Sequence, residues 1–151
     1  MALYKLLHLL SAVIWVGGMF FAYVVLRPSM GALLELPERM RLWSGVFARF
    51  FKWVWMAVFL LPGTGFYMIY LYGGMAVVPR FIHLMLLSGI VMMVIFVYLF
   101  FACYVYFNRL VEEKEWQQAA EKLATIRKLI AVNLTLGVLT VCVAMTATVW
   151  G

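Results

Sequence analysis

Residues 81–107 read FIHLMLLSGIVMMVIFVYLFFACYVYF, an apolar run in which His83 is the only side chain that readily gains charge near neutral pH. About 20 such residues cross a ~30 Å hydrocarbon layer as a helix, so the run is long enough to span a membrane. Three further apolar runs occur at Leu3–Leu26, Trp53–Tyr72 and Leu129–Trp150. Together they predict an all-α membrane protein, a four-transmembrane-helix up-down bundle that forms a single domain over residues 1–151.

The composition of the whole chain supports this class. Hydrophobic residues make up 68% of the sequence and charged residues 12%, which is far more apolar than a soluble domain. The abundant Leu, Ala and Met favour helix, and the alternation typical of a membrane barrel is absent. The N-terminal run is too long for the apolar region of a signal peptide, so we expect it to be a true span.

The basic residues are distributed unevenly between the two ends of the predicted spans. Ten of the twelve fall in the two longer connections, namely Arg27, Arg39, Arg41, Arg49, Lys52, Arg109, Lys114, Lys122, Arg127 and Lys128. Only Lys5 and Arg80 lie at the opposite end. The positive-inside rule then predicts a bacterial inner (plasma) membrane protein whose longer connections are cytoplasmic and whose termini are both periplasmic. The net charge of +6 thus indicates contact with the lipid bilayer and not with nucleic acid.

The connections have features of their own. Arg27-Pro28 should end the first span, because the residue before a proline avoids helical geometry. Residues 37–52 alternate apolar and basic side chains and are typical of a short amphipathic helix on the cytoplasmic surface. Pro62 should kink the second span. In an up-down bundle with short connections, the first and third spans lie diagonally opposite.

The two histidines are the candidate metal-binding residues. His8 lies about a turn into the first span and His83 about a turn into the third, at depths that differ by roughly 5 Å of helical rise. An ionisable residue at membrane depth is costly and marks a functional site by default. Ala12 and Trp15 share the helical face of His8, and Ser11 lies beside it, which leaves room for a flat cofactor.

Three interpretations of this pair are open at the level of sequence. Each histidine could simply bond a neighbouring helix or face the outer interface. Alternatively, both could ligate the iron of haem b, which suits electron transfer between a donor and an acceptor that the sequence does not identify. A third interpretation is a copper site completed by sulfur from Met75, Met85 or Met145. Lys5 and Arg80, just outside the histidines, would pair with haem propionates or anchor helix ends by snorkelling.

Other chemistry is poorly represented in the sequence. All six acidic residues fall in the connections predicted to be cytoplasmic, so ion or substrate transport coupled to an intramembrane carboxylate is not expected. No phosphate-binding or nucleophile motif occurs, which leaves a membrane oxidoreductase as the enzymatic option. Cys103 and Cys142 differ in depth by roughly 13 Å and should not form a disulfide. The paired Gly17-Gly18 on the first span would allow a homodimer.

Several segments resemble a known family. Residues 7–21, which read LHLLSAVIWVGGMFF, together with Thr64-Gly65 and residues 80–87, which read RFIHLMLL, resemble the CopD-like copper-resistance membrane proteins. The layout is also similar to the smaller HemJ family, which is linked to protoporphyrinogen oxidation and haem binding. In that family a lysine usually follows the third-span histidine by two residues, whereas this chain has Met85, which argues against the oxidase activity.

The resemblance implies a bundle that carries b-type haem or handles copper, with His8 and His83 as the residues carried over. From the histidine pair we predict an integral membrane b-type haem protein. A copper-handling protein, for resistance or uptake, is the alternative. A protoporphyrinogen-oxidase-like enzyme and a structural subunit are further alternatives.

Overall fold

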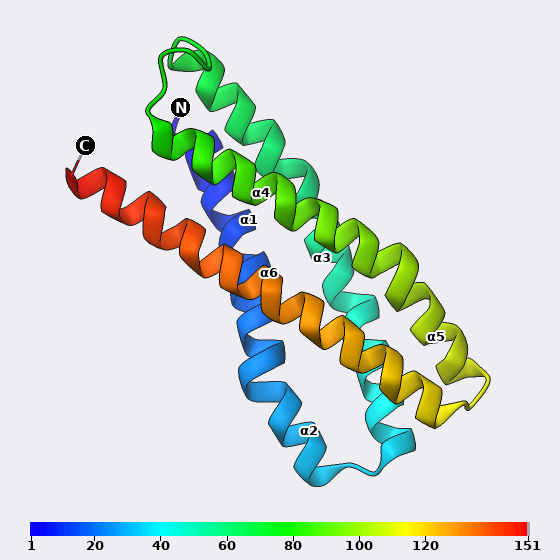
Figure 1. Ribbon diagram of the computed structural model, residues 1–151. Coiled ribbons are helices and arrows are strands. Elements are labelled where there is room, and N and C mark those ends of the chain that lie inside the picture. Colours follow the sequence, from blue (N-terminus) through cyan, green and yellow to red (C-terminus); the bar gives the residue numbers. More distant parts are fainter. Residues whose placement is uncertain (151) are drawn as a thin grey trace.

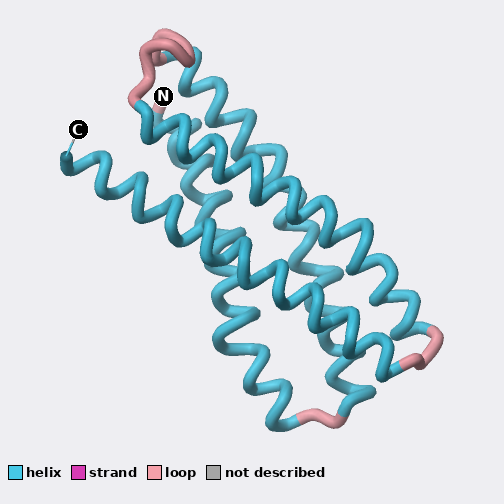
Figure 2. The backbone as a smooth tube through the Cα atoms, in the orientation of Figure 1, coloured by secondary structure: helices cyan, strands magenta, loops and turns pink. Residues whose placement is uncertain are grey.

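The computed structural model describes the backbone of residues 1–150 and the side chains of residues 1–146. Four long helices run alternately up and down, joined by short loops (Figures 1 and 2). In chain order the elements are α1 (Ala2–Phe20), the π-helical turn η1 (Phe21–Leu26), α2 (Arg27–Leu33), α3 (Leu36–Leu71), α4 (Arg80–Tyr98), the π-helical turn η2 (Leu99–Tyr104), α5 (Val105–Glu112) and α6 (Trp116–Trp150). The described residues contain no strand.

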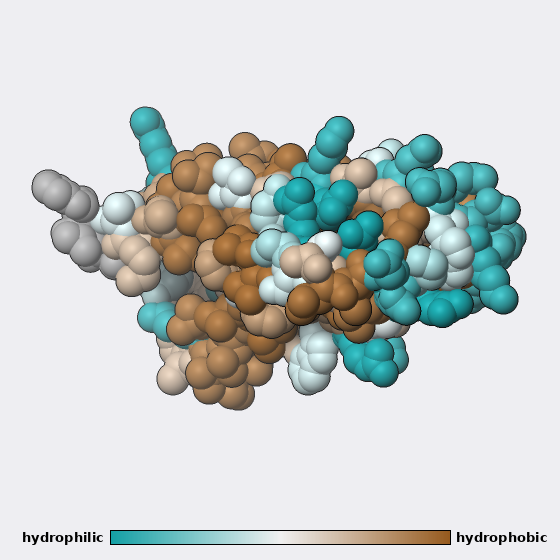
Figure 3. All heavy atoms as spheres, turned by 90° about the horizontal axis from the view of Figure 1, so that it is seen from below, coloured by the Kyte–Doolittle hydropathy of each residue, from teal (hydrophilic) through white to brown (hydrophobic). Residues whose placement is uncertain are grey.

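Each of the four helical stretches is long and apolar enough to cross a membrane. They comprise Ala2–Leu33, Leu36–Leu71, Arg80–Glu112 and Trp116–Thr146. On the face seen in Figure 3, hydrophilic residues gather toward one end of the molecule and hydrophobic residues cover much of the remainder. The predicted all-α, four-span class is therefore confirmed, while the orientation of the termini stays a prediction.

The first span does not end at Arg27-Pro28 as the sequence predicted. In η1 the backbone hydrogen bonds join residues five apart, so that the N–H of Arg27 donates to the carbonyl of Ala22. The helix then continues as α2, in whose first turn Pro28 lies, and ends at Leu33. Pro28 supplies no N–H to the helical hydrogen bonds. The π turn shifts the bonding register just before the proline, and the helix passes through.

The amphipathic segment is also placed differently from the prediction. Residues 37–52 do not form a separate surface helix, because α3 is unbroken from Leu36 to Leu71. Four apolar side chains of this segment are at most 3% exposed, namely Met40, Trp43, Phe47 and Phe51, whereas Leu42 is 44% exposed. Its apolar face therefore packs against other helices of the bundle and not against lipid.

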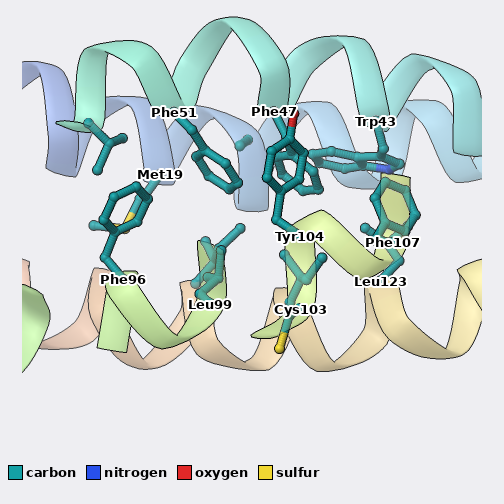
Figure 4. Close-up of a cluster of buried hydrophobic side chains, with 14 of the residues drawn as sticks. Met19, Trp43, Phe47, Phe51, Phe96, Leu99, Cys103, Tyr104, Phe107 and Leu123 are labelled. Atoms are coloured by element: carbon teal, nitrogen blue, oxygen red, sulfur yellow. The ribbon is translucent and has the colours of Figure 1, made fainter. Parts of the chain in front are cut away.

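The core beside this segment is aromatic. Phe47, which is fully buried, stacks on Phe51 with a centroid separation of 5.0 Å. It also meets the edges of Tyr104 at 6.1 Å and Phe107 at 6.2 Å. Figure 4 shows these rings from α3 and from the third span meeting between the helices. Stacked and edge-to-face pairs are the arrangements that aromatic rings prefer, so the contacts hold the two spans together.

The bundle consists of two closely packed pairs, α1 with α3 and α4 with α6, and α6 also contacts α1 (Figure 1). Small residues allow these helices to approach each other. A Cβ atom at Gly18 would overlap the ring of Phe50, and one at Gly137 would lie 2.7 Å from Cγ2 of Val16. The end of the bundle that carries the N-terminus also carries the loop before α4, so both histidines lie near the same end.

Candidate metal-binding site

The strongest polar contact between the first two spans is made by His8. Its imidazole is half-buried against α3, and Nδ1 lies 2.8 Å from Oγ1 of Thr64. Thr64 is only 6% exposed, so this contact is largely shielded from the surroundings. A Cβ atom built on Gly65 would lie 3.4 Å from Cε1 of His8, which means that the ring lies directly against the backbone of α3.

The local sequence of α3 explains how Thr64 comes to receive the imidazole. Pro62 lies inside the helix without breaking it and supplies no N–H to the ladder. In the same turn, the Thr64 hydroxyl lies 2.6 Å from the carbonyl oxygen of Leu60 and 3.2 Å from that of Leu61. The hydroxyl is therefore held against its own helix, with its oxygen presented to α1.

The contacts of Thr64 also assign the proton on His8. A hydroxyl has a single proton to donate, and the carbonyl oxygen of Leu60 can only accept one. With Thr64 donating to Leu60 at the shorter distance, its oxygen accepts a hydrogen bond from Nδ1–H of His8. This tautomer leaves Nε2 without a proton. A metal-binding histidine is typically oriented in this way, with its second ring nitrogen donating to a neighbouring group.

A pair of tyrosine rings lies one turn from the histidine, toward the N-terminus. Tyr4 precedes His8 by four residues and Tyr67 follows Thr64 by three, so both lie on the faces where α1 and α3 meet. Their centroids are 4.3 Å apart. The sequence analysis did not predict the pairing of Tyr4 with Tyr67. The i−4 and i+3 spacings about His8 and Thr64 were the available signal.

His83 occupies a different environment from the one predicted. It is exposed, and its Nδ1 contacts only the carbonyl oxygen of Pro79 on its own chain segment, at 3.3 Å. The side chains that share its face are also exposed, Leu87 at 59% and Val94 at 64%. The buried face of α4 instead carries Met92, which follows His83 by nine residues and so lies about 180° around the helix. The expected convergence of His83 with His8 within one chain is therefore not formed.

The remaining predicted residues divide into buried and exposed groups. Ser11 and Trp15 are each 2% exposed; the hydroxyl of Ser11 donates to the carbonyl of Leu7, and Trp15 meets the edge of Phe96 at 6.1 Å. Ala12 is half-buried beside them. Protein side chains therefore fill the face that was expected to hold a flat cofactor. Lys5 and Arg80 are exposed.

The methionines proposed as sulfur ligands are spread over different surroundings. Met75 is 41% exposed in the loop before α4, Met145 is 61% exposed on α6, and Met85 is half-buried. Among the described residues, no group of three or more His, Cys, Asp or Glu side chains could hold a metal ion. A closed site with four protein ligands, as in structural zinc centres, is therefore not formed by residues of these types in the described part of the chain.

Comparison with known proteins identifies one family. A family model described as copper resistance protein D matches residues 44–147, which is 104 of the 151 residues. The match begins within α3 and includes Thr64 and His83, whereas His8 lies before it. No curated protein and no solved structure matches the chain.

Proposed function

Since this chain belongs to the copper resistance protein D family, we propose that it is a multi-pass membrane protein that handles copper ions, and that His8 is a copper contact. The observation that supports His8 is its hydrogen bond to the buried Thr64, at 2.8 Å. That bond occupies Nδ1 of the imidazole and leaves Nε2 as a ligand for a metal. The sequence-based alternative of copper handling is thus preferred to haem-based electron transfer.

The donors along the spans suit a soft ion. The chain has eleven methionines and two histidines, and its six acidic residues all lie at positions 35–38 or 112–121, near the loops at the basic end. Imidazole and thioether groups favour Cu(I), whereas hard divalent cations require oxygen ligands. A soft, monovalent cargo fits a bundle whose spans carry methionines and an oriented imidazole.

Haem b has less support from this geometry. His83 lies on the outward face of α4, and Ser11 and Trp15 fill the space beside His8. A haem held by one chain would need α4 to rotate by about half a turn, which would remove Met92 and Phe96 from the core. We therefore propose no haem for this chain.

The experiment is a Cu(I) titration of the full chain in detergent micelles, in competition with a chromophoric Cu(I) chelator under anaerobic conditions. The unmodified chain should withdraw copper from the chelator. His8→Ala should weaken this withdrawal at least tenfold, because it removes the oriented nitrogen. His83→Ala is the matched control, since it removes the other imidazole of the chain, and it should bind nearly as the unmodified chain does.

Two outcomes would overturn the proposal. One is an unchanged copper affinity in His8→Ala. The other is a purified protein with a Soret band that both His8→Ala and His83→Ala abolish, because such a result requires both imidazoles on one haem iron.

A further inference from the structure

Three arginines from three different elements come together toward the basic end of the molecule. Arg27 opens α2, Arg39 lies in the first turn of α3, and Arg127 lies in α6. Arg27 and Arg127 line the same small pocket, and the positive charges of Arg27 and Arg39 both act on Arg127. These three arginines are half-buried, whereas the other four arginines of the chain are exposed. The three arginines that lie close together are therefore also the three that are half-buried.

The surroundings of this arginine cluster are aromatic and aliphatic. The guanidinium of Arg27 lies 4.9 Å from the centroid of the Tyr23 ring. A small pocket beside it is lined by Ala22, Tyr23, Arg27, Trp43, Arg127 and Ile130. Two of its six lining residues are cationic and the others are apolar or aromatic. The pocket is too narrow to hold a water molecule, so it marks where the side chains of Arg27 and Arg127 pack beside each other.

No acidic side chain neutralises the cluster. Within the described part of the chain, none of these arginines forms an ion pair. The acids nearest in sequence, Glu35 and Glu38, are exposed. Like charges that are partly withdrawn from water disfavour one another. An external anion would remove this cost, so the arrangement calls for a negatively charged ligand.

We propose that Arg27, Arg39 and Arg127 form a binding site for the phosphate group of an anionic phospholipid. The planar guanidinium matches phosphate oxygens with paired hydrogen bonds, which makes arginine the preferred side chain for such groups. Basic pockets between transmembrane helices bind lipid head groups by this chemistry. A free phosphate ion shares the head-group chemistry but lacks the acyl chains that would lie in the membrane beside the bundle.

The test is native mass spectrometry of the full chain after incubation with phosphatidylglycerol or with phosphatidylcholine, which has no net charge. The unmodified chain should retain phosphatidylglycerol in preference to phosphatidylcholine. Arg127→Gln should weaken retention by roughly tenfold, because a charge-assisted hydrogen bond is lost. Lys128→Gln is the matched control: it removes the same charge from the neighbouring, exposed position and should change retention less than twofold. Arg127→Lys should give an intermediate value.

A parallel arm replaces the lipid with inorganic phosphate and follows thermal unfolding of the delipidated chain. Stabilisation by phosphate that needs Arg127, without selective retention of phosphatidylglycerol, would assign the same site to the free ion and overturn the lipid assignment. Equal retention of both lipids would also overturn the proposal, as would equal weakening by Arg127→Gln and Lys128→Gln. Arg127→Gln must keep the helical content and elution volume of the unmodified chain, and the Arg27→Gln variant provides a second test if it does not.

Discussion

The position of one proton determines which nitrogen of His8 is available to bind a metal. Threonine hydroxyls inside helices commonly bond the carbonyl four residues back, and Thr64 does so to Leu60 at 2.6 Å. That bond leaves only the acceptor capacity of the oxygen for the imidazole on α1. In the proposed copper site, Thr64 would position the ring and select its tautomer without touching the metal itself.

This role predicts the effect of Thr64→Val, which keeps the shape of the side chain but removes its oxygen. The Cu(I) dissociation constant should rise by about 10–100-fold, the usual effect of losing a group that orients a ligand. Thr64→Ser should retain most of the affinity. The measurement is the same anaerobic chelator competition.

Thr135→Val is the matched control for that experiment. The Thr135 hydroxyl is exposed and bonds only the carbonyl of Ala131 on its own helix, at 2.9 Å, so copper affinity should not change. If Thr64→Val and Thr135→Val bind copper equally well, Thr64 does not position His8.

At the scale of the elements, the approach of α6 to α1 depends on Gly137. An alanine there would place its methyl 2.7 Å from Cγ2 of Val16 and 3.3 Å from Cε of Met92. The β-branched Val16 has few alternative rotamers, so the helices must separate. Gly89, in α4, is the contrasting position, because a Cβ atom there would have no other atom within 4 Å.

The two glycines predict stability changes of opposite sign. Gly137→Ala should destabilise the protein by about 1–3 kcal/mol through overpacking. Gly89→Ala should stabilise it by up to about 1 kcal/mol, because alanine is the better helix former. The measurement is thermal unfolding in one detergent, followed by circular dichroism. A gain in stability from Gly137→Ala would show that α1 and α6 are not in close contact.

At the scale of the whole molecule, the two ends differ in chemistry. One end carries the N-terminus, the loop before α4 and both histidines. Ten of the twelve basic residues lie toward the other end, in α2, in α5, in the turn before α6 and in the adjoining parts of α3 and α6. By the positive-inside rule, we expect the basic end to face the cytoplasm. The copper contact would then lie toward the periplasm and the arginine cluster toward the cytoplasmic leaflet.

This orientation predicts a labelling pattern in intact spheroplasts. In a chain with Cys103→Ala and Cys142→Ala, a membrane-impermeant maleimide should label Lys5→Cys directly. The same reagent should label Glu113→Cys only after the membrane is opened, because that turn would face the cytoplasm. Both positions are exposed, so access to the reagent depends on sidedness alone. The reverse pattern would invert the assignment of the two ends.

The sequence by itself determined the number of spans, their approximate positions, the single-sided basic charge and the family. Each of these is a property of one segment measured against the thickness of the bilayer, or of a motif read along the chain. The sequence located His8 and Thr64-Gly65, but it gave no reason to expect a hydrogen bond between His8 and Thr64. The thickness of the bilayer does not determine whether the first helix ends at Arg27-Pro28 or continues beyond it.

Only the tertiary structure decided which face of each helix points inward. The third span is apolar around its whole circumference, so its hydropathy did not reveal that Met92 faces the core and His83 faces outward. The pairing of His8 with Thr64 depends on the rotation of two helices about their axes and on their close approach at Gly65. The arginine cluster likewise joins positions 27, 39 and 127, which come together only when α2, α3 and α6 are assembled.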